Sequence, residues 1–116
     1  MMKYSDSLKK NKDFQKVYKN GTSKANRYLV MYVLPVECAR NRLGISVSKK
    51  VGNSVVRHRV TRLIREIYRL HESEIRCGVD IVVVGRPAVK DLTYTQVENA
   101  MIQLCDRTGI REEVSE

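Results

Sequence analysis

The 116-residue chain lacks the residues that would place it in several classes of protein. It has no tryptophan, one phenylalanine and two prolines. Its cysteines, Cys38, Cys77 and Cys105, are odd in number, far apart and without a CxxC pair, so we expect reduced thiols and no disulfide framework. His58 and His71 share no spacing typical of metal ligands. Composition alone therefore indicates neither a disulfide-rich secreted domain nor a zinc module.

Long apolar segments are also missing. The longest apolar run, residues 28–36, is too short to span a bilayer. The first residues contain no apolar stretch of the kind found in signal peptides. We therefore expect a single cytoplasmic domain with no membrane partner.

Acidic residues are scarce in the first two thirds of the chain. The net charge is +9, and 17 of the 22 Lys and Arg residues, but only 4 of the 13 acidic residues, precede residue 72. A basic surface of this size is typical of nucleic-acid-binding proteins. A protein nuclease would need clustered carboxylates to hold metal ions, and Asp6, Asp13, Glu37 and Glu66 show no such spacing. We expect no catalytic residue and no metal or cofactor bound by the protein alone.

The stretch from Lys49 to Arg69 holds the densest positive charge. Its apolar residues recur every three or four positions, which predicts an amphipathic helix from about Ser54 to Leu70 or His71. Asn53 or Ser54 would cap its first turn. The opposite face would carry basic side chains. The predicted polyanion-binding residues are Lys49, Lys50, Asn53, Arg57, His58, Arg59, Arg62, Arg65 and Arg69.

Two interpretations of this basic face are open. It could be no more than a solvated surface, although an ordinary solvated helix intersperses Glu among its Arg residues. Here Glu66 is the only acid in the stretch, and six crowded basic groups repel one another in the absence of a partner. Arginine binds phosphate bidentately and stacks on bases, so a nucleic-acid surface is the favoured interpretation.

The remaining patterns predict an α/β (α+β) fold around one sheet. The predicted elements are a helix over residues 11–20 ending at a left-handed Gly21, strands at 27–36, 43–48 and 80–85, and a helix from about Thr93 to Gly109. The first two strands should pair as a hairpin, and the long helix should form a crossover to the third. Residues 1–10 are expected to be a mobile basic arm, and residues 110–116 a mobile tail.

Aromatic residues gather near the N-terminus. Five of the seven Tyr and Phe residues lie in residues 1–32, interleaved with Lys and Arg. Aromatic rings in a basic groove bind single strands by stacking. Phe14 and Tyr18 could instead be core residues, because they lie one helical turn apart, and Tyr32 is the better candidate. The predicted single-strand cleft contains Lys12, Phe14, Lys16, Tyr18, Tyr28 and Tyr32.

Several motifs together resemble a known family. The segment KKVGNSVVRHRVTRLIRE (residues 49–66) is similar to the signature of the bacterial ribonuclease P protein subunit. The segments LKKNKDFQKVYKNGTS (8–23), LGISVSKK (43–50) and LTYTQ (92–96) match as well, in the same order. The resemblance covers nearly the whole chain.

This resemblance implies a fold and a function. The fold would be a two-layer sandwich like domain 2 of ribosomal protein S5, with three to four strands and a left-handed crossover. The chain would assemble, as one protein per RNA, with a catalytic RNA that removes the 5′ leader of precursor tRNA. Mg²⁺ would be held mainly by that RNA. The Arg-rich helix would contact the RNA, and the cleft between sheet and first helix would hold the leader.

The match is not complete at every position. Arg57 and Arg59 occupy the two arginine positions of the family's Arg-Asn-Arg triplet, whereas His58 replaces the Asn. Arg62 and Arg65 fill later basic positions, and Thr61 stands where Lys is common. Two alternatives stay open from the residues alone: a ribosomal or other structural RNA-binding protein, and a DNA-binding regulator that places the Arg-rich helix in a major groove.

Overall fold

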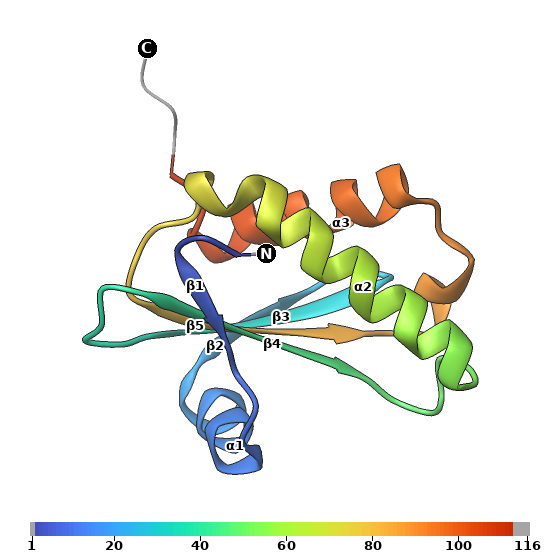
Figure 1. Ribbon diagram of the computed structural model, residues 1–116, viewed down its shortest axis with the longest axis horizontal. Helices are drawn as coiled ribbons and strands as arrows, with labels where there is room; N and C mark the ends of the chain where they lie inside the picture. The colour runs from blue at the N-terminus through green and yellow to red at the C-terminus, as the bar shows by residue number, and fades with distance from the viewer. Residues whose placement is uncertain (1, 113–116) are drawn as a thin grey trace.

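The computed structural model describes residues 2–112, and in this range one mixed sheet carries helices on both faces (Figure 1). The strands are β1 (Ser5–Ser7), β2 (Thr22–Ala25), β3 (Leu29–Pro35), β4 (Asn41–Val47) and β5 (Val79–Gly85). The α-helices are α1 (Asn11–Asn20), α2 (Ser54–His71) and α3 (Tyr94–Thr108). Two short 3-10 helices, η1 (Glu72–Glu74) and η2 (Pro87–Asp91), precede β5 and α3. In Figure 1, α2 and α3 lie above the sheet and α1 lies below it.

The strand order is β1-β4-β5-β3-β2, which corrects the predicted hairpin. β3 and β4 do not pair with each other, because β5 lies between them, antiparallel to β3 and parallel to β4. The five-residue connection 36–40 is long enough to cross the roughly 10 Å that one intervening strand occupies. β5 takes the central place because its run VDIVVVG is buried on both faces.

The crossover from β4 through α2 to β5 joins two adjacent parallel strands, as the order of elements predicted. In Figure 1, β4 and β5 both point to the right, α2 lies above them, and β5 lies behind β4. The crossover is therefore left-handed, as the family resemblance implied and against the usual right-handed rule.

Two short edge strands raise the strand count above the three to four expected. β1 and β2 read SDS and TSKA, with no apolar run to mark them in the sequence. β1 lies within the segment expected to be a mobile arm and pairs with β4. Leu8 is buried, and the Glu72 carboxylate accepts backbone N–H bonds from Lys3 and Tyr4 at 2.8 and 3.0 Å. From Lys3 onward the arm therefore makes contacts with the rest of the domain.

The first residues of the segment expected to be a mobile tail pack against the rest of the chain. Ile110 is buried, and Arg111 forms an antiparallel bridge with Ile75. Residues 113–116 lie outside the described range.

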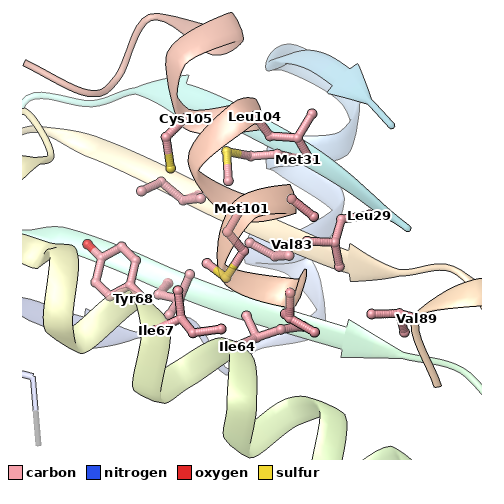
Figure 2. Close-up of a cluster of buried hydrophobic side chains, with 14 of the residues drawn as sticks. Leu29, Met31, Ile64, Ile67, Tyr68, Val83, Val89, Met101, Leu104 and Cys105 are labelled. Carbon is pink, nitrogen blue, oxygen red and sulfur yellow. The ribbon is translucent and has the colours of Figure 1, made fainter. Parts of the chain in front are cut away.

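One apolar core lies between the sheet and the helices α2 and α3. Figure 2 shows side chains of both helices meeting those of β3 and β5. Ile64 and Ile67 of α2 and Leu104 of α3 are at most 1 % exposed. Each such burial contributes about 1.5–3 kcal/mol. The apolar stripe of α2 thus holds the helix down and fixes which of its faces points outward.

The helix ends follow their sequence signals with one exception. Thr93 and Gln96 form a capping box at the predicted start of α3, and Gly109 ends the helix in the left-handed conformation with φ 78°. Gly21 is not left-handed, since its φ is −82°. A Cβ atom at Gly21 would lie 2.7 Å from the carbonyl oxygens of Val17 and Val33, so close packing and not backbone hand requires glycine there.

Candidate nucleic-acid interface

The outward face of α2 is basic and open. His58, Arg62 and Arg65 are exposed, and no salt bridge between residues 2 and 112 involves them. The opposite face of the same helix is buried through Val60 and Ile64. The helical period therefore places two guanidinium groups and an imidazole together in solvent, where a polyanion could neutralise the positive charge.

Two other arginines of α2, Arg69 and Arg59, are hydrogen-bonded within the protein. Arg69 pairs with Glu66 at 2.5 Å, and its hydrogen bond lowers the pKa of Glu66. Arg59 donates to the backbone carbonyls of Lys90 at 3.2 Å and Leu92 at 3.0 Å. These carbonyls tie α2 to the end of η2 but leave the charge of Arg59 without an acid partner.

Arg57 lies on the shoulder of α2 and is half-buried. Its Nε is buried, and no group in the described residues bonds to it. Its carbonyl accepts a bond from the Thr61 hydroxyl at 2.9 Å. Of the two arginines in the triplet, neither presents its whole guanidinium to solvent in the way that Arg62 and Arg65 do.

The turn before α2 extends the basic surface. Lys49 and Lys50 are exposed in a turn closed by a bond from the Val51 N–H to the Ser48 carbonyl at 3.0 Å. Asn53 caps the helix, because its side-chain oxygen accepts the Val56 N–H at 3.0 Å. The two lysines thus lie just before the N-terminus of α2, whose macrodipole adds positive potential.

Hollows lie on both sides of Arg62. One, of about 330 Å³, lies between α2 and β1 and includes Ser7, Arg65 and Arg69. The other, of about 400 Å³, is lined by Arg59, Leu63, Glu66 and Tyr94 in addition to Arg62. No sequence pattern indicated that Tyr94 would lie here, since only the packing of α3 against α2 brings it there. The basic face is therefore shaped and not flat.

A second candidate surface lies on the opposite side of the sheet. Tyr18 and Tyr32 pack edge to face with centroids 4.9 Å apart, and Phe14 lies 6.3 Å from Tyr18. All three are half-buried beside buried Val17. A Cβ atom at Gly44 would lie 2.7 Å from the Phe14 ring, so the ring lies directly on the backbone of β4. We call Phe14, Tyr18 and Tyr32 the aromatic cluster.

The structure does not bring the other predicted cleft residues into this cluster. Tyr28 precedes β3 and packs against the main core on the α3 side of the sheet, which corrects its expected place beside Tyr32. Lys12 and Lys16 are exposed. At roughly 100° per residue they fall on the side of α1 opposite Phe14, so they contribute long-range charge and not ring contact.

An ion-paired arginine links α1 to the sheet. Arg42 of β4 donates to both carboxylate oxygens of Asp80, at 3.0 and 2.6 Å, and to Asp13 of α1 at 3.4 Å. Asp80 is 1 % exposed. The alternation of β4 and β5 could have indicated this pair, but only once the two strands were known to be neighbours.

Metal-ligand clusters, membrane-spanning helices and reactive thiols would each indicate other chemistry in the part of the chain that the structure covers. No three His, Cys, Asp or Glu side chains gather there in a way that could hold a metal ion. None of its helices is long and apolar enough to cross a membrane. The cysteines are free, and burial raises the pKa of Cys105 to about 12, which makes that thiol unreactive.

Comparison with known proteins gives one consistent result. The family model described as Ribonuclease P matches residues 2–109. The ribonuclease P protein component of Lachnoclostridium phytofermentans is 58 % identical over 100 residues, which are 86 % of each chain. That of Alkaliphilus metalliredigens is 48 % identical over 103 residues, 89 % of this chain and 93 % of the relative.

Solved structures agree with this result. The RNase P protein of Staphylococcus aureus superposes with a TM-score of 0.87 at 41 % identity, over 93 % of this chain and 99 % of that one. The RNase P protein of Thermotoga maritima gives a TM-score of 0.81 at 30 % identity, over 88 % and 96 % of the two chains. The five-stranded fold described above is thus the fold of these proteins.

Proposed function

The chain belongs to the ribonuclease P protein family, and from this premise we propose that it binds both the catalytic RNA and the 5′ leader of precursor tRNA. It is a protein component of ribonuclease P. In the proposal, the basic face of α2 with the turn at Lys49 and Lys50 contacts the catalytic RNA. The aromatic cluster holds the single-stranded leader in the cytoplasm, where the holoenzyme matures the tRNA 5′ end.

One observation carries the RNA half of this proposal. His58, Arg62 and Arg65 are exposed together without acid partners among residues 2–112, on a helix whose other face is fixed in the core. Mutual repulsion in such a group is relieved when phosphates approach, and release of their counterions drives binding. His58 can donate to phosphate or stack on a base in place of the family's Asn.

The leader half rests on the aromatic cluster. Phe14 and Tyr18 belong to α1, which lies on the face of the sheet opposite α2 (Figure 1). One RNA could therefore lie on α2 while a second strand contacts the aromatic cluster. Stacking on aromatic rings requires no particular base, which suits leaders of varied sequence.

The proposal gives the protein a binding role and assigns the chemistry to the RNA. The described residues offer no cluster of ligands for a metal, so the Mg²⁺ ions that activate water in the holoenzyme would be held by the RNA. The protein would orient the leader and neutralise phosphate charge.

Reconstitution tests the function as a whole. The protein is added to a bacterial ribonuclease P RNA at physiological Mg²⁺, and 5′ processing of precursor tRNA is followed. We expect processing that the RNA alone does not achieve under these conditions. Absence of stimulation, with RNA binding intact, would instead favour a structural RNA-binding role.

The first prediction concerns Tyr32. Replacement Tyr32→Ala should weaken holoenzyme binding to precursor tRNA by at least about fivefold, the lower limit for losing one stacked base. Binding of mature tRNA should not change, because only precursor tRNA has a leader. The exposed Tyr4→Ala serves as a matched control. Equal losses for both tRNAs would show that Tyr32 is structural.

A further inference from the structure

A pocket on the flank of α3 that faces away from α2 is used by neither proposed surface. Its volume is about 430 Å³, which is within the range of small-ligand sites. The turn before β3 forms one wall and α3 forms the other. The side chains that line it are Asn26, Arg27, Tyr28, Gln96, Asn99 and Gln103.

The pocket is preorganised by Asn26. Its side-chain oxygen accepts the backbone N–H groups of Tyr28 at 3.0 Å and Leu29 at 2.9 Å. Its amide nitrogen donates to the Ala100 carbonyl at 3.0 Å and to Gln103 Oε1 at 2.9 Å. One half-buried amide thus fixes the Tyr28 turn to α3, so the backbone that carries the Tyr28 ring is held in place before any ligand arrives.

The chemistry of the lining selects a class of ligand. Asn99 and Gln103 lie one helical turn apart and present both amide donors and acceptors, which can pair with the edges of a nucleobase. Tyr28 offers a ring on which a base can stack, with the Arg27 guanidinium 5.9 Å from its centroid. No carboxylate lines the pocket, so nothing there favours a cation.

The rim carries uncompensated positive charge. Arg86 donates to the Asn26 carbonyl at 2.9 Å, and Arg107 donates to the Ala25 carbonyl at 2.8 Å. Neither these two arginines nor Arg27 takes part in an ion pair within the described chain. Three cations around an amide-lined pocket favour an anionic strand over a neutral small molecule or an apolar peptide.

We propose that this pocket binds one unpaired RNA nucleotide, with its base stacked on Tyr28 and its edge bonded to the amides of Asn99 and Gln103. Its phosphate would lie among Arg27, Arg86 and Arg107. The inference rests on the proposed function, since it takes RNA as the partner. The nucleotide could belong to the catalytic RNA or to precursor tRNA, and the chemistry of recognition is the same for both.

Side-chain amide NMR signals provide a direct test. Single-stranded hexaribonucleotides of each base are added to the full-length protein. We expect saturable shifts of the Asn99 and Gln103 side-chain signals, at concentrations that differ among the four bases. Shifts confined to α2 and the aromatic cluster would overturn the pocket while leaving the proposed function intact. No shift anywhere would count against both.

Substitutions separate recognition from folding. Asn99→Ala removes an exposed amide that makes no hydrogen bond in residues 2–112, so it should leave stability unchanged and reduce the difference among bases at the pocket. Gln15→Ala, another exposed helical amide, is its control. Tyr28→Leu should weaken binding at the pocket by at least about fivefold. Unaltered base selectivity in Asn99→Ala would contradict the assignment.

Two further arms identify the RNA. The affinity of Tyr28→Leu for the catalytic RNA alone is compared with the affinity of its reconstituted holoenzyme for precursor tRNA. A loss in the first arm assigns the nucleotide to the catalytic RNA, and a loss only in the second assigns it to precursor tRNA. No loss in either arm would overturn the proposal and leave a protein as the ligand to seek.

Discussion

Arginine side chains in this protein differ in what their guanidinium groups meet. Arg40, Arg42, Arg69 and Arg111 meet carboxylates. Arg59, Arg86 and Arg107 meet backbone carbonyls, which fix their position without cancelling their charge. Arg62 and Arg65 meet neither within residues 2–112. Residue type alone does not distinguish these roles, so each substitution has to be interpreted from its own contacts.

Arg42 is predicted to position the aromatic cluster. Arg42→Ala would leave the carboxylate of Asp80 buried and unpaired and would release Asp13 of α1. Removing one partner of a buried pair costs about 3–5 kcal/mol. Because the Arg42 side chain is 36 % exposed, we expect about 2 kcal/mol, measured by urea unfolding. Binding of the leader should weaken more than binding of the catalytic RNA.

Arg40→Ala is the matched control. Arg40 pairs with Asp6 at 3.1 Å, but both side chains are about half exposed, so stability should barely change. Equal destabilisation by the two substitutions would show that burial of Asp80 is not what matters.

At the scale of the element, the stability of α2 depends on side-chain interactions at its two ends. The sequence predicts Asn53 as part of the RNA surface, and the structure gives it a capping bond to the Val56 N–H. Asn53→Ala should therefore cost about 1 kcal/mol of unfolding free energy, whereas Asn53→Ser should restore most of it. Chemical denaturation measures both.

RNA affinity distinguishes capping from direct contact at Asn53. If capping is its role, Asn53→Ser should bind the catalytic RNA as the wild type does. Wild-type stability with weakened RNA binding in this variant would contradict that and support a direct contact.

The other end of α2 is predicted to be sensitive to pH. His71 lies between two carboxylates, with Nδ1 2.7 Å from Glu74 of η1 and Nε2 2.8 Å from Glu98 of α3. Arg111 also binds Glu74, at 2.8 Å. Burial lowers the pKa of His71, but bonds to Glu98 and Glu74 outweigh it, and the net pKa is raised. The charged form is thus favoured in the folded protein.

The sign of the effect follows from this shift. A raised folded pKa stabilises the protein fully below the ordinary His pKa of about 6.5, and this stabilisation is lost as pH rises through the higher folded value. The urea midpoint should therefore fall as pH rises above about 6.5 and through the raised pKa of folded His71. His71→Gln should flatten this slope. A slope unchanged by His71→Gln would exclude His71 as its origin.

For the whole molecule, the sequence predicted features that depend on neighbouring residues better than it predicted which strands pair. The amphipathic period of α2 and the ends of α3 near Thr93 and Gly109 were correct because each depends on neighbours within one helix. The hairpin was wrong because chain order does not show that β5 enters between β3 and β4. The left-handed crossover came from resemblance alone.

In the candidate site, too, features set within one helix were predicted better than contacts between elements. The basic face of α2 could be predicted from its helical period. The aromatic cluster could be predicted in part, since Phe14 and Tyr18 share a helix face, but Tyr28 was misplaced because it lies just before β3 begins. The amides of Asn99 and Gln103 had a readable helical spacing, and only the fold brings the Tyr28 turn beside them.

The central claim is that exposed arginines of α2 contact RNA phosphates. The most direct test is the salt dependence of catalytic-RNA binding by the double variant Arg62→Ala/Arg65→Ala. Its slope of log affinity against log salt should be smaller by about one for each phosphate that the missing guanidinium groups no longer neutralise. Arg40→Ala/Arg76→Ala, which removes the same charge elsewhere, should keep nearly the wild-type slope. Equal slopes for the two double variants would contradict the account.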